Sequence, residues 1–226
     1  MLMKFNVGIL AAVALCSGTG IFAPCAAHAQ LDRFYIKGDL GGNWTVKTDL
    51  KEFLGPVTPG SKIKFDPGVR VGIAAGYEVT DWFAAEVETG VLANSIDTVT
   101  DATRVDAGFA NVPFLVNARF HCPHMNRLAP YFGGGLGVSG AVLDVDHLEI
   151  NGTGIHGSDS DAVFAYQAFG GLRYKLNERM GLSLEYHYFG TTEPSWKADF
   201  SGFGSDKIRF GAVQTHAVSV AFDYHF

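Results

Sequence analysis

Cysteine is scarce in this chain, with three among 226 residues. Cys16 and Cys25 lie in a leader that we expect to be removed, so Cys122 has no partner for an internal disulfide. Basic residues number 17 against 23 acidic ones and form no basic patch, which argues against nucleic acid as a partner. No apolar run reaches the roughly 18 residues that a spanning helix needs, and no helical period of useful length is present.

The first 29 residues follow the pattern of a secretory signal peptide. Lys4 supplies the positive charge, an apolar run follows at 7–15, and Ala27-His28-Ala29 matches the small-residue cleavage site. Ser17 to Gly20 interrupt the apolar run too early for a membrane anchor. We therefore expect a signal peptide at 1–29, cleaved after Ala29, and one domain at 30–226 without a cofactor.

Glycine is abundant, at 28 residues or about 12% against a usual ~7%. Nearly half of them, 13 residues, lie in segments where apolar and polar residues alternate with period two, the mark of a β-strand with two unlike faces. Eight such segments occur, at 34–44, 65–78, 83–91, 111–121, 131–139, 164–174, 182–188 and 216–226. Their connections are short at 80–81, 122–129 and 175–179, and long at 46–62, 94–106, 142–161 and 191–213. This predicts an all-β fold, an eight-stranded antiparallel up-and-down barrel.

Alternation alone fits either a soluble barrel with an apolar lumen or a membrane barrel with an apolar outer wall. The Gly42-Asn43-Trp44 stretch even matches the G-x-W of lipocalins. Four features favour the membrane arrangement. The polar face carries charges of both signs interleaved with glycine, aromatics gather at the ends of the apolar face, segments of about 9–11 residues suit a tilted spanning strand, and no helix follows the last segment. We expect a transmembrane barrel with four long outer loops and three short periplasmic turns.

The charges of the polar face are expected to line the lumen. Side chains just fill the interior of an eight-stranded barrel, so isolated charges there are strongly penalised and must pair. The predicted lumen charge network consists of Lys37, Asp39, Arg70, Glu78, Glu86, Glu88, Arg119, Arg173, Glu185 and Asp223. Two roles remain open for it: a fixed plug of ion pairs, or a gate whose pairs exchange to open a narrow water path.

In order and spacing, several stretches resemble the small outer-membrane β-barrel superfamily that includes the OmpA transmembrane domain and the opacity-type surface proteins. They are VPFLVNARF (112–120), PYFGGGLGVS (130–139), FAYQAFGGLRY (164–174), LEYHYF (184–189) and the terminal HAVSVAFDYHF (216–226). The resemblance implies a Gram-negative outer-membrane barrel with periplasmic termini, surrounded by outer-membrane lipid and lipopolysaccharide. It also implies that Phe222, Tyr224 and Phe226 form the signal read by the outer-membrane assembly machinery.

Three further patterns suggest sites and have simpler explanations. The G-x-G-x-x-G string at 135–140 has no βαβ unit around it, so a nucleotide site is not expected. The HCPH string at 121–124 falls in a short turn without a second ligand pair. The acidic stretch at 144–161 lacks the fixed spacing of a Ca²⁺ loop and is read as a solvated loop. We predict no metal site.

The best functional interpretation is a non-enzymatic surface protein with a structural or adhesive role through its long outer loops. A narrow channel for ions or small apolar solutes is the alternative. A lipid A-modifying enzyme ranks third, because Ser183, Glu185 and His187 share the lumen face, away from acyl chains, and no G-x-S-x-G occurs. Apolar loop residues either contact a host or envelope partner or pack on one another; they are Phe53, Leu54, Trp196, Phe200 and Phe203.

Overall fold

The computed structural model describes residues 31–226 apart from 54–59, 101, 123–126, 151–152 and 199–205. A 3₁₀ helix at Leu31–Arg33 comes first, and among the described residues no helix is long and apolar enough to cross a membrane. Twelve antiparallel strands follow. They are β1 (Phe34–Thr45), β2 (Thr48–Phe53), β3 (Lys62–Phe65), β4 (Gly68–Thr80), β5 (Phe83–Val99), β6 (Ala102–His121), β7 (Leu128–Ile150), β8 (Thr153–Lys175), β9 (Met180–Thr191), β10 (Ser195–Ala198), β11 (Asp206–Phe210) and β12 (Val213–His225).

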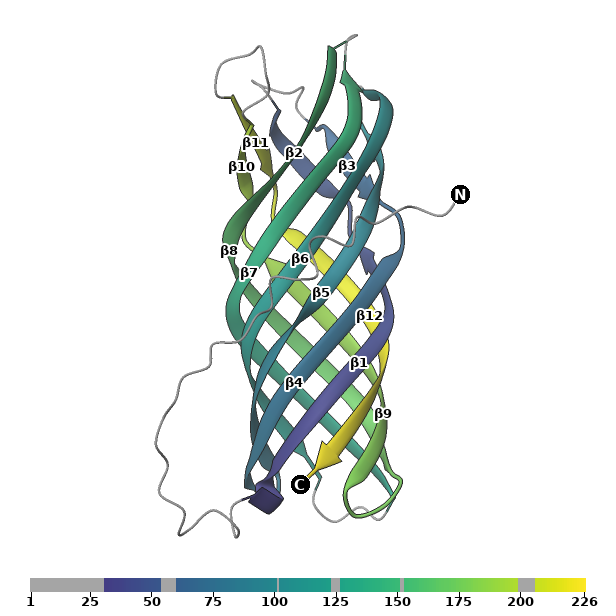
Figure 1. The fold of residues 1–226 in the computed structure, drawn as a ribbon, viewed down its shortest axis with the longest axis vertical. Helices are drawn as coiled ribbons and strands as arrows, with labels where there is room; N and C mark the ends of the chain where they lie inside the picture. The colour runs from purple at the N-terminus through teal and green to yellow at the C-terminus, as the bar shows by residue number, and fades with distance from the viewer. Residues whose placement is uncertain (1–30, 54–59, 101, 123–126, 151–152, 199–205) are drawn as a thin grey trace.

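Eight of these strands close into a barrel (Figure 1). The ring runs β5-β4-β1-β12-β9-β8-β7-β6, and the pairing of β6 with β5 completes it. The last strand pairs with the first, from Tyr35 opposite His225 to Thr45 opposite Thr215. Closure pairs the backbone N–H and C=O groups that an open sheet would leave facing lipid. The predicted eight-stranded antiparallel barrel is confirmed.

Four short strands extend one end of the barrel. β2, β3, β10 and β11 lie opposite the C-terminal end, beside the tall strands β5–β8 (Figure 1). The sheet order β10-β11-β2-β3-β5 gives them the places that β9, β12, β1 and β4 hold in the other half. We call the half with β1, β4, β9 and β12 the lower ring, and the half with β2, β3, β10 and β11 the upper ring. β5–β8 run through both.

In the lower ring, apolar side chains face outward and polar ones face the lumen. On β12, Val218 and Val220 are 41% and 52% exposed, whereas Ala217, Ser219 and Ala221 are each 1% exposed. Opposite faces of a strand alternate with every residue, so the period-two pattern of the sequence translates directly into an apolar wall and a polar interior.

In the upper ring the two faces exchange character. On β7, Val138 faces outward and Ser139 inward, but beyond them Ala141, Leu143 and Val145 are buried and Asp144 is exposed. The residues expected as the second and third loops, 94–106 and 142–161, continue as strand for most of their length. They had looked like loops because the alternation continues with its apolar and polar faces interchanged.

Glycine makes room for the large polar side chains of the lumen. Across the ladders, Asp39 stands opposite Gly72 and Asn117 opposite Gly135. A Cβ at either glycine would collide with the side chain of its partner. The same relation holds for three further cross-strand pairs: Tyr35 with Gly76, Tyr131 with Gly171, and Asp223 with Gly181. These five strand glycines are therefore required by the large side chains of the polar lumen.

Candidate functional site: the charged lumen

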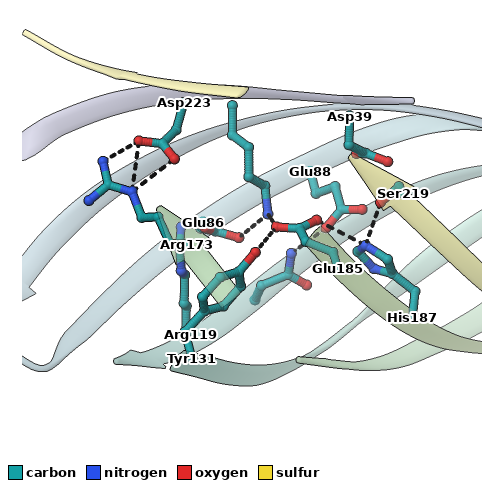
Figure 2. A network of polar contacts seen from close by, with 12 residues as sticks. Asp39, Glu86, Glu88, Arg119, Tyr131, Arg173, Glu185, His187, Ser219 and Asp223 are labelled. Carbon is teal, nitrogen blue, oxygen red and sulfur yellow. Dashed lines mark hydrogen bonds and ion pairs between the residues drawn. The ribbon is translucent and has the colours of Figure 1, made fainter. Parts of the chain in front are cut away.

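Seven charged residues of the lower ring meet inside the lumen, each at most 6% exposed. They come from five strands and are Lys37, Asp39, Arg70, Glu86, Glu88, Arg119 and Glu185. Figure 2 labels five of them, Asp39, Glu86, Glu88, Arg119 and Glu185, among the polar side chains that point into the lumen. A charge removed from water is stable only with partners, so the contacts of each one decide what the set can do.

Lys37 joins two carboxylates from different strands. Its Nζ lies 3.2 Å from Glu185 Oε1 and 3.5 Å from Glu86 Oε2. Tyr35 donates a hydrogen bond of 2.6 Å to Glu86 Oε1, and Tyr131 donates one to Glu185 Oε1. Each carboxylate is therefore held by a cation and a phenol from another strand, which ties β1, β5, β7 and β9 together across the lumen.

Arg119 fills the space between two aromatic rings. Its guanidinium carbon lies 4.0 Å from the Tyr131 ring centroid and 5.7 Å from that of Tyr35. Its Nη1 is 3.2 Å from Glu86 Oε1. Cation–π contacts of this kind stabilise a desolvated guanidinium by about 2 kcal/mol or more, in addition to the ion pair.

Arg70 bridges a second pair of carboxylates, with Nε 2.8 Å from Asp39 Oδ1 and Nη2 2.5 Å from Glu88 Oε1. The other Glu88 oxygen accepts hydrogen bonds of 2.6 Å from both Asn117 and Gln167. Five strands supply this group, and its geometry leaves Arg70 as the one base between two acids.

The remaining predicted charges lie nearer the C-terminal end of the barrel. Arg173 makes a forked ion pair with Asp223, whose carboxylate is also 3.2 Å from His225 Nε2. Glu78 is separate, because its carboxylate lies 3.8 Å from His225 and its side chain is 32% exposed. The structure thus brings nine of the ten predicted charges into buried or half-buried pairs and leaves Glu78 at the rim.

His187 also faces the lumen, but not in the geometry of a catalytic triad. Its Nε2 lies 3.0 Å from Glu185 Oε2 and 3.4 Å from Ser219 Oγ (Figure 2). A triad needs the acid and the hydroxyl on different ring nitrogens. Here both meet the same nitrogen, while Nδ1 has no partner among the described residues.

Five polar partners were not among the predicted network residues: Tyr35, Tyr131, Asn117, Gln167 and His187. The sequence could have identified them, because each alternates onto the same face of its strand as the charged residues. Selecting charged residues alone omitted the hydrogen-bond donors that a buried carboxylate requires.

Apolar side chains fill the lumen above the charges. Leu92, Leu115, Ala165 and Phe189 form a first buried cluster. In the upper ring a larger one includes Trp196, 1% exposed, whose indole N–H donates to the Ala141 carbonyl at 2.9 Å. Trp196 therefore packs within the molecule, against Phe109 and Phe210. The side chains of Phe53, Leu54, Phe200 and Phe203 lie outside the described residues.

The other sequence candidates lie in different places. The glycines of the 135–140 string are all inside β7, with no helix after them. Cys122 is exposed at the end opposite the upper ring, and His124 is outside the described residues, as are the side chains of 146–157. Phe222 and Phe226 face outward at 45% and 47% exposure, with Tyr224 5.5 Å from Phe226 between ring centroids.

A family model described as "Outer membrane protein beta-barrel domain" matches residues 9–226. The chain belongs to this family. The predicted location in the bacterial outer membrane is therefore confirmed, and with it the assignment of the apolar wall to lipid. No curated protein sequence matches the chain significantly.

Solved structures agree with this outer-membrane barrel in fold. OprG from Pseudomonas aeruginosa is 20% identical, with a TM-score of 0.58 and coverage of 85% of this chain and 96% of that one. AlkL is 16% identical, with a TM-score of 0.55 and coverage of 92% and 96%. Neisserial surface protein A is 15% identical, with a TM-score of 0.55 and coverage of 85% and 97%. At these identities the likeness concerns the fold alone.

Proposed function

We propose that this protein is a non-enzymatic surface protein whose barrel is a sealed support for its outer end. One observation carries the proposal: charged side chains fill one part of the lumen and apolar side chains fill the next. Buried ion pairs occupy the lower ring and an apolar cluster occupies the upper ring. An ion crossing the barrel would have to separate the pairs and then pass the buried apolar cluster, and each step is costly.

The proposal includes the absence of catalysis. The hydroxyl near His187 is that of Ser219 and not that of the predicted Ser183, which is buried elsewhere on the lumen face. Ser219, His187 and Glu185 are each at most 1% exposed inside the barrel wall. Acyl chains lie outside that wall. In a catalytic triad, one imidazole nitrogen accepts the proton of the serine while the acid holds the other nitrogen. Here Glu185 and Ser219 both contact His187 Nε2, so the imidazole cannot act in this way.

We infer the processing and assembly steps from the sequence. Residues 1–29 act as a signal peptide removed after Ala29, and the described domain follows. Phe222, Tyr224 and Phe226 serve as the assembly signal, a role supported by their outward position on the closing strand β12.

Planar-bilayer recording tests the sealed lumen. The refolded chain is expected to give no conductance steps, whereas regular steps in the wild type that disappear in Arg70→Ala or Glu86→Ala would overturn the proposal and identify a gate. A surface role is tested by replacing residues 146–156, between the paired Val145 and Gly157, with a two-residue turn. Binding of cells to host or matrix surfaces should fall while heat-modifiable gel mobility, the control for folding, is unchanged.

The upper ring favours a second candidate, passage of small apolar solutes. Its interior is apolar, and among the described residues β8 and β10 share no ladder of backbone hydrogen bonds. A solute entering there would leave through the wall, because the charges block the lower ring. Uptake of a radiolabelled alkane into cells with and without the protein separates this function from a purely structural one.

A further inference from the structure

A cluster of aromatic rings on the outer wall surrounds one imidazole. On the wall of the lower ring, His216 of β12 stands between Trp44 of β1 and Tyr188 of β9 in the two ladders. Its ring centroid is 5.9 Å from that of Trp44, nearly parallel at 15°, and 5.4 Å from that of Tyr188. The Tyr186 hydroxyl lies 2.6 Å from His216 Nδ1. We call Trp44, Tyr186, Tyr188 and His216 the wall cluster.

The wall cluster marks the outer boundary of the apolar band. Below it, the outward residues of the same strands are apolar, as at Leu40, Leu184 and Val220. Above it the exposed residues are Val46, Lys47, Thr192, Ala212 and Gln214, three of them polar. The backbone N–H of Val46 bonds to the Gln214 carbonyl at 2.8 Å, and the exposed Lys47 is the next residue along the chain. Because long connections of such barrels face outward, the cluster lies at the headgroup level of the outer leaflet.

The opposite boundary carries an aromatic cluster with different chemistry. Trp82, Phe83, Phe120 and Phe132 stack there with centroids 5.3 to 6.0 Å apart. The only polar side-chain atom among them is the indole nitrogen of Trp82. Both clusters can anchor the barrel at an interface. Tyrosine is also an anchoring residue, so the imidazole of His216 is what distinguishes the wall cluster from the opposite one.

The hydrogen bond between Tyr186 and His216 orients the His216 imidazole so that it can act as a hydrogen-bond donor. When the Tyr186 hydroxyl donates to Nδ1, the ring hydrogen resides on Nε2, the nitrogen without a hydrogen-bond partner among the described residues. A fixed N–H donor beside exposed ring faces and a lysine matches a phosphorylated sugar: the donor and cation meet phosphate, and the ring faces meet sugar C–H groups.

We propose that the wall cluster is a binding site for the phosphorylated glucosamine headgroup of lipid A in the outer leaflet. His216 Nε2 and Lys47 bind a phosphate, and Trp44 and Tyr186, each 45% exposed, pack against the sugar. The site is on the outer wall and is independent of the sealed lumen and of any partner at the upper ring.

Native mass spectrometry of the refolded full chain in detergent tests the site by titration with bisphosphoryl lipid A. The competitor lipids are phosphatidylglycerol, which has one phosphate and no sugar, and phosphatidylethanolamine. His216→Phe keeps an aromatic ring and removes the donor, so lipid A affinity should fall about tenfold, as expected for one lost charge-assisted hydrogen bond. Tyr186→Phe releases the orientation of the imidazole and should cause a smaller fall.

The matched control is Trp82→Phe in the opposite cluster, which should bind lipid A as the wild type does. Heat-modifiable mobility verifies folding, and Tyr186→Phe, which removes a single oxygen, carries the test where His216→Phe does not fold. Unchanged lipid A affinity in both variants would reduce the wall cluster to an aromatic anchor and overturn the proposal. Equal affinity of the wild type for phosphatidylglycerol would also overturn it, because the site would then not recognise the sugar.

Discussion

The two halves of this barrel follow opposite rules. In the lower ring, ladders are long, with β12 and β9 paired from Val213–Thr191 to Tyr224–Met180, and the wall is apolar outside and polar inside. In the upper ring β2 and β3 pair at only two positions, and the wall is polar outside and apolar inside. The same tall strands pass through both halves. The two halves differ in the solvent that surrounds them. Lipid around the lower ring favours an apolar exterior, and water around the upper ring favours an apolar interior.

The comparison explains how each half is held together. In lipid, closure of every backbone hydrogen bond stabilises the wall, and the lumen is free to be polar provided that its charges pair. In water, short ladders alone are marginal, so the upper ring depends on its buried apolar cluster. Substitutions should therefore affect the two halves by different mechanisms.

The largest effect is expected from removing a base in the lower ring. Arg70→Met leaves Asp39 and Glu88 buried with their ion pair lost, and should lower the free energy of unfolding by about 3–5 kcal/mol. Urea titration in phosphatidylcholine vesicles, followed by tryptophan fluorescence, measures this. Glu88→Gln is the matched control: Arg70 keeps Asp39, so its loss should be clearly smaller. Equal losses would contradict the view of Arg70 as the one base between two acids.

Trp196→Ala should damage the upper ring by about 3–5 kcal/mol, because a fully buried indole packed against Phe109 and Phe210 is lost. The lower ring should survive, so limited proteolysis is expected to cut near 191–213 while heat-modifiable mobility is retained. Trp196→Phe keeps most of the packing and loses the bond to the Ala141 carbonyl, at about 1 kcal/mol. Collapse of the whole barrel in Trp196→Ala would show that the two halves are not separable.

Two neighbouring glycines in β1 distinguish a steric clash in the barrel wall from the general effect of replacing a glycine. A Cβ at Gly41 would collide with the backbone of Val218 and Ser219, whereas at Gly42 the nearest atom is the Gly68 carbonyl oxygen at 3.8 Å. Gly41→Ala should destabilise the β1–β12 seam by about 1–3 kcal/mol and Gly42→Ala by less than about 0.5. The midpoint temperature of the heat-modifiable gel shift measures both, and similar values would refute the steric argument.

The smallest effect concerns pH at the upper ring. A hydrogen bond from Lys51, aided by Arg209 at 2.9 Å, lowers the pKa of Glu193 below its ordinary 4.5. The ion pairs therefore contribute fully above about pH 4.5, and their contribution is lost as the pH falls through the lowered pKa. Carboxyl NMR titration measures this directly. Glu193→Gln should remove the pH dependence of proteolysis near β10, and an unchanged dependence would assign it to other groups.

Much of the lower ring was predictable from residues alone. Alternation gave the strand faces, and burial of charge required pairing, so Lys37, Arg70 and Glu185 could be named as lumen residues. Their actual partners could not be named, because Glu86 lies between Lys37 and Arg119 only once the ring has closed and its register is set. A one-residue slip would move every one of these side chains to the other face.

The upper ring was less predictable. At 142–161 apolar residues still alternate with polar ones, but this stretch contains no aromatic residue that would mark where lipid ends and water begins. Trp196 therefore had two interpretations, a contact residue or a packed one, and the packed one was preferred. The local sequence around Trp196 does not show whether the indole is buried. Its burial depends on where the segment packs against β7, a strand distant in sequence.

The sequence by itself determined the class of molecule: a closed β-barrel with an apolar wall, because strand periodicity and glycine content are local properties that any register preserves. Tertiary structure decided which charges meet, where the faces exchange character, and that His216 stands among three aromatic rings on the wall. The physical reason is that these contacts join strands distant in sequence, and ladder register, ring closure and the surrounding solvent select among the pairs that local pattern allows.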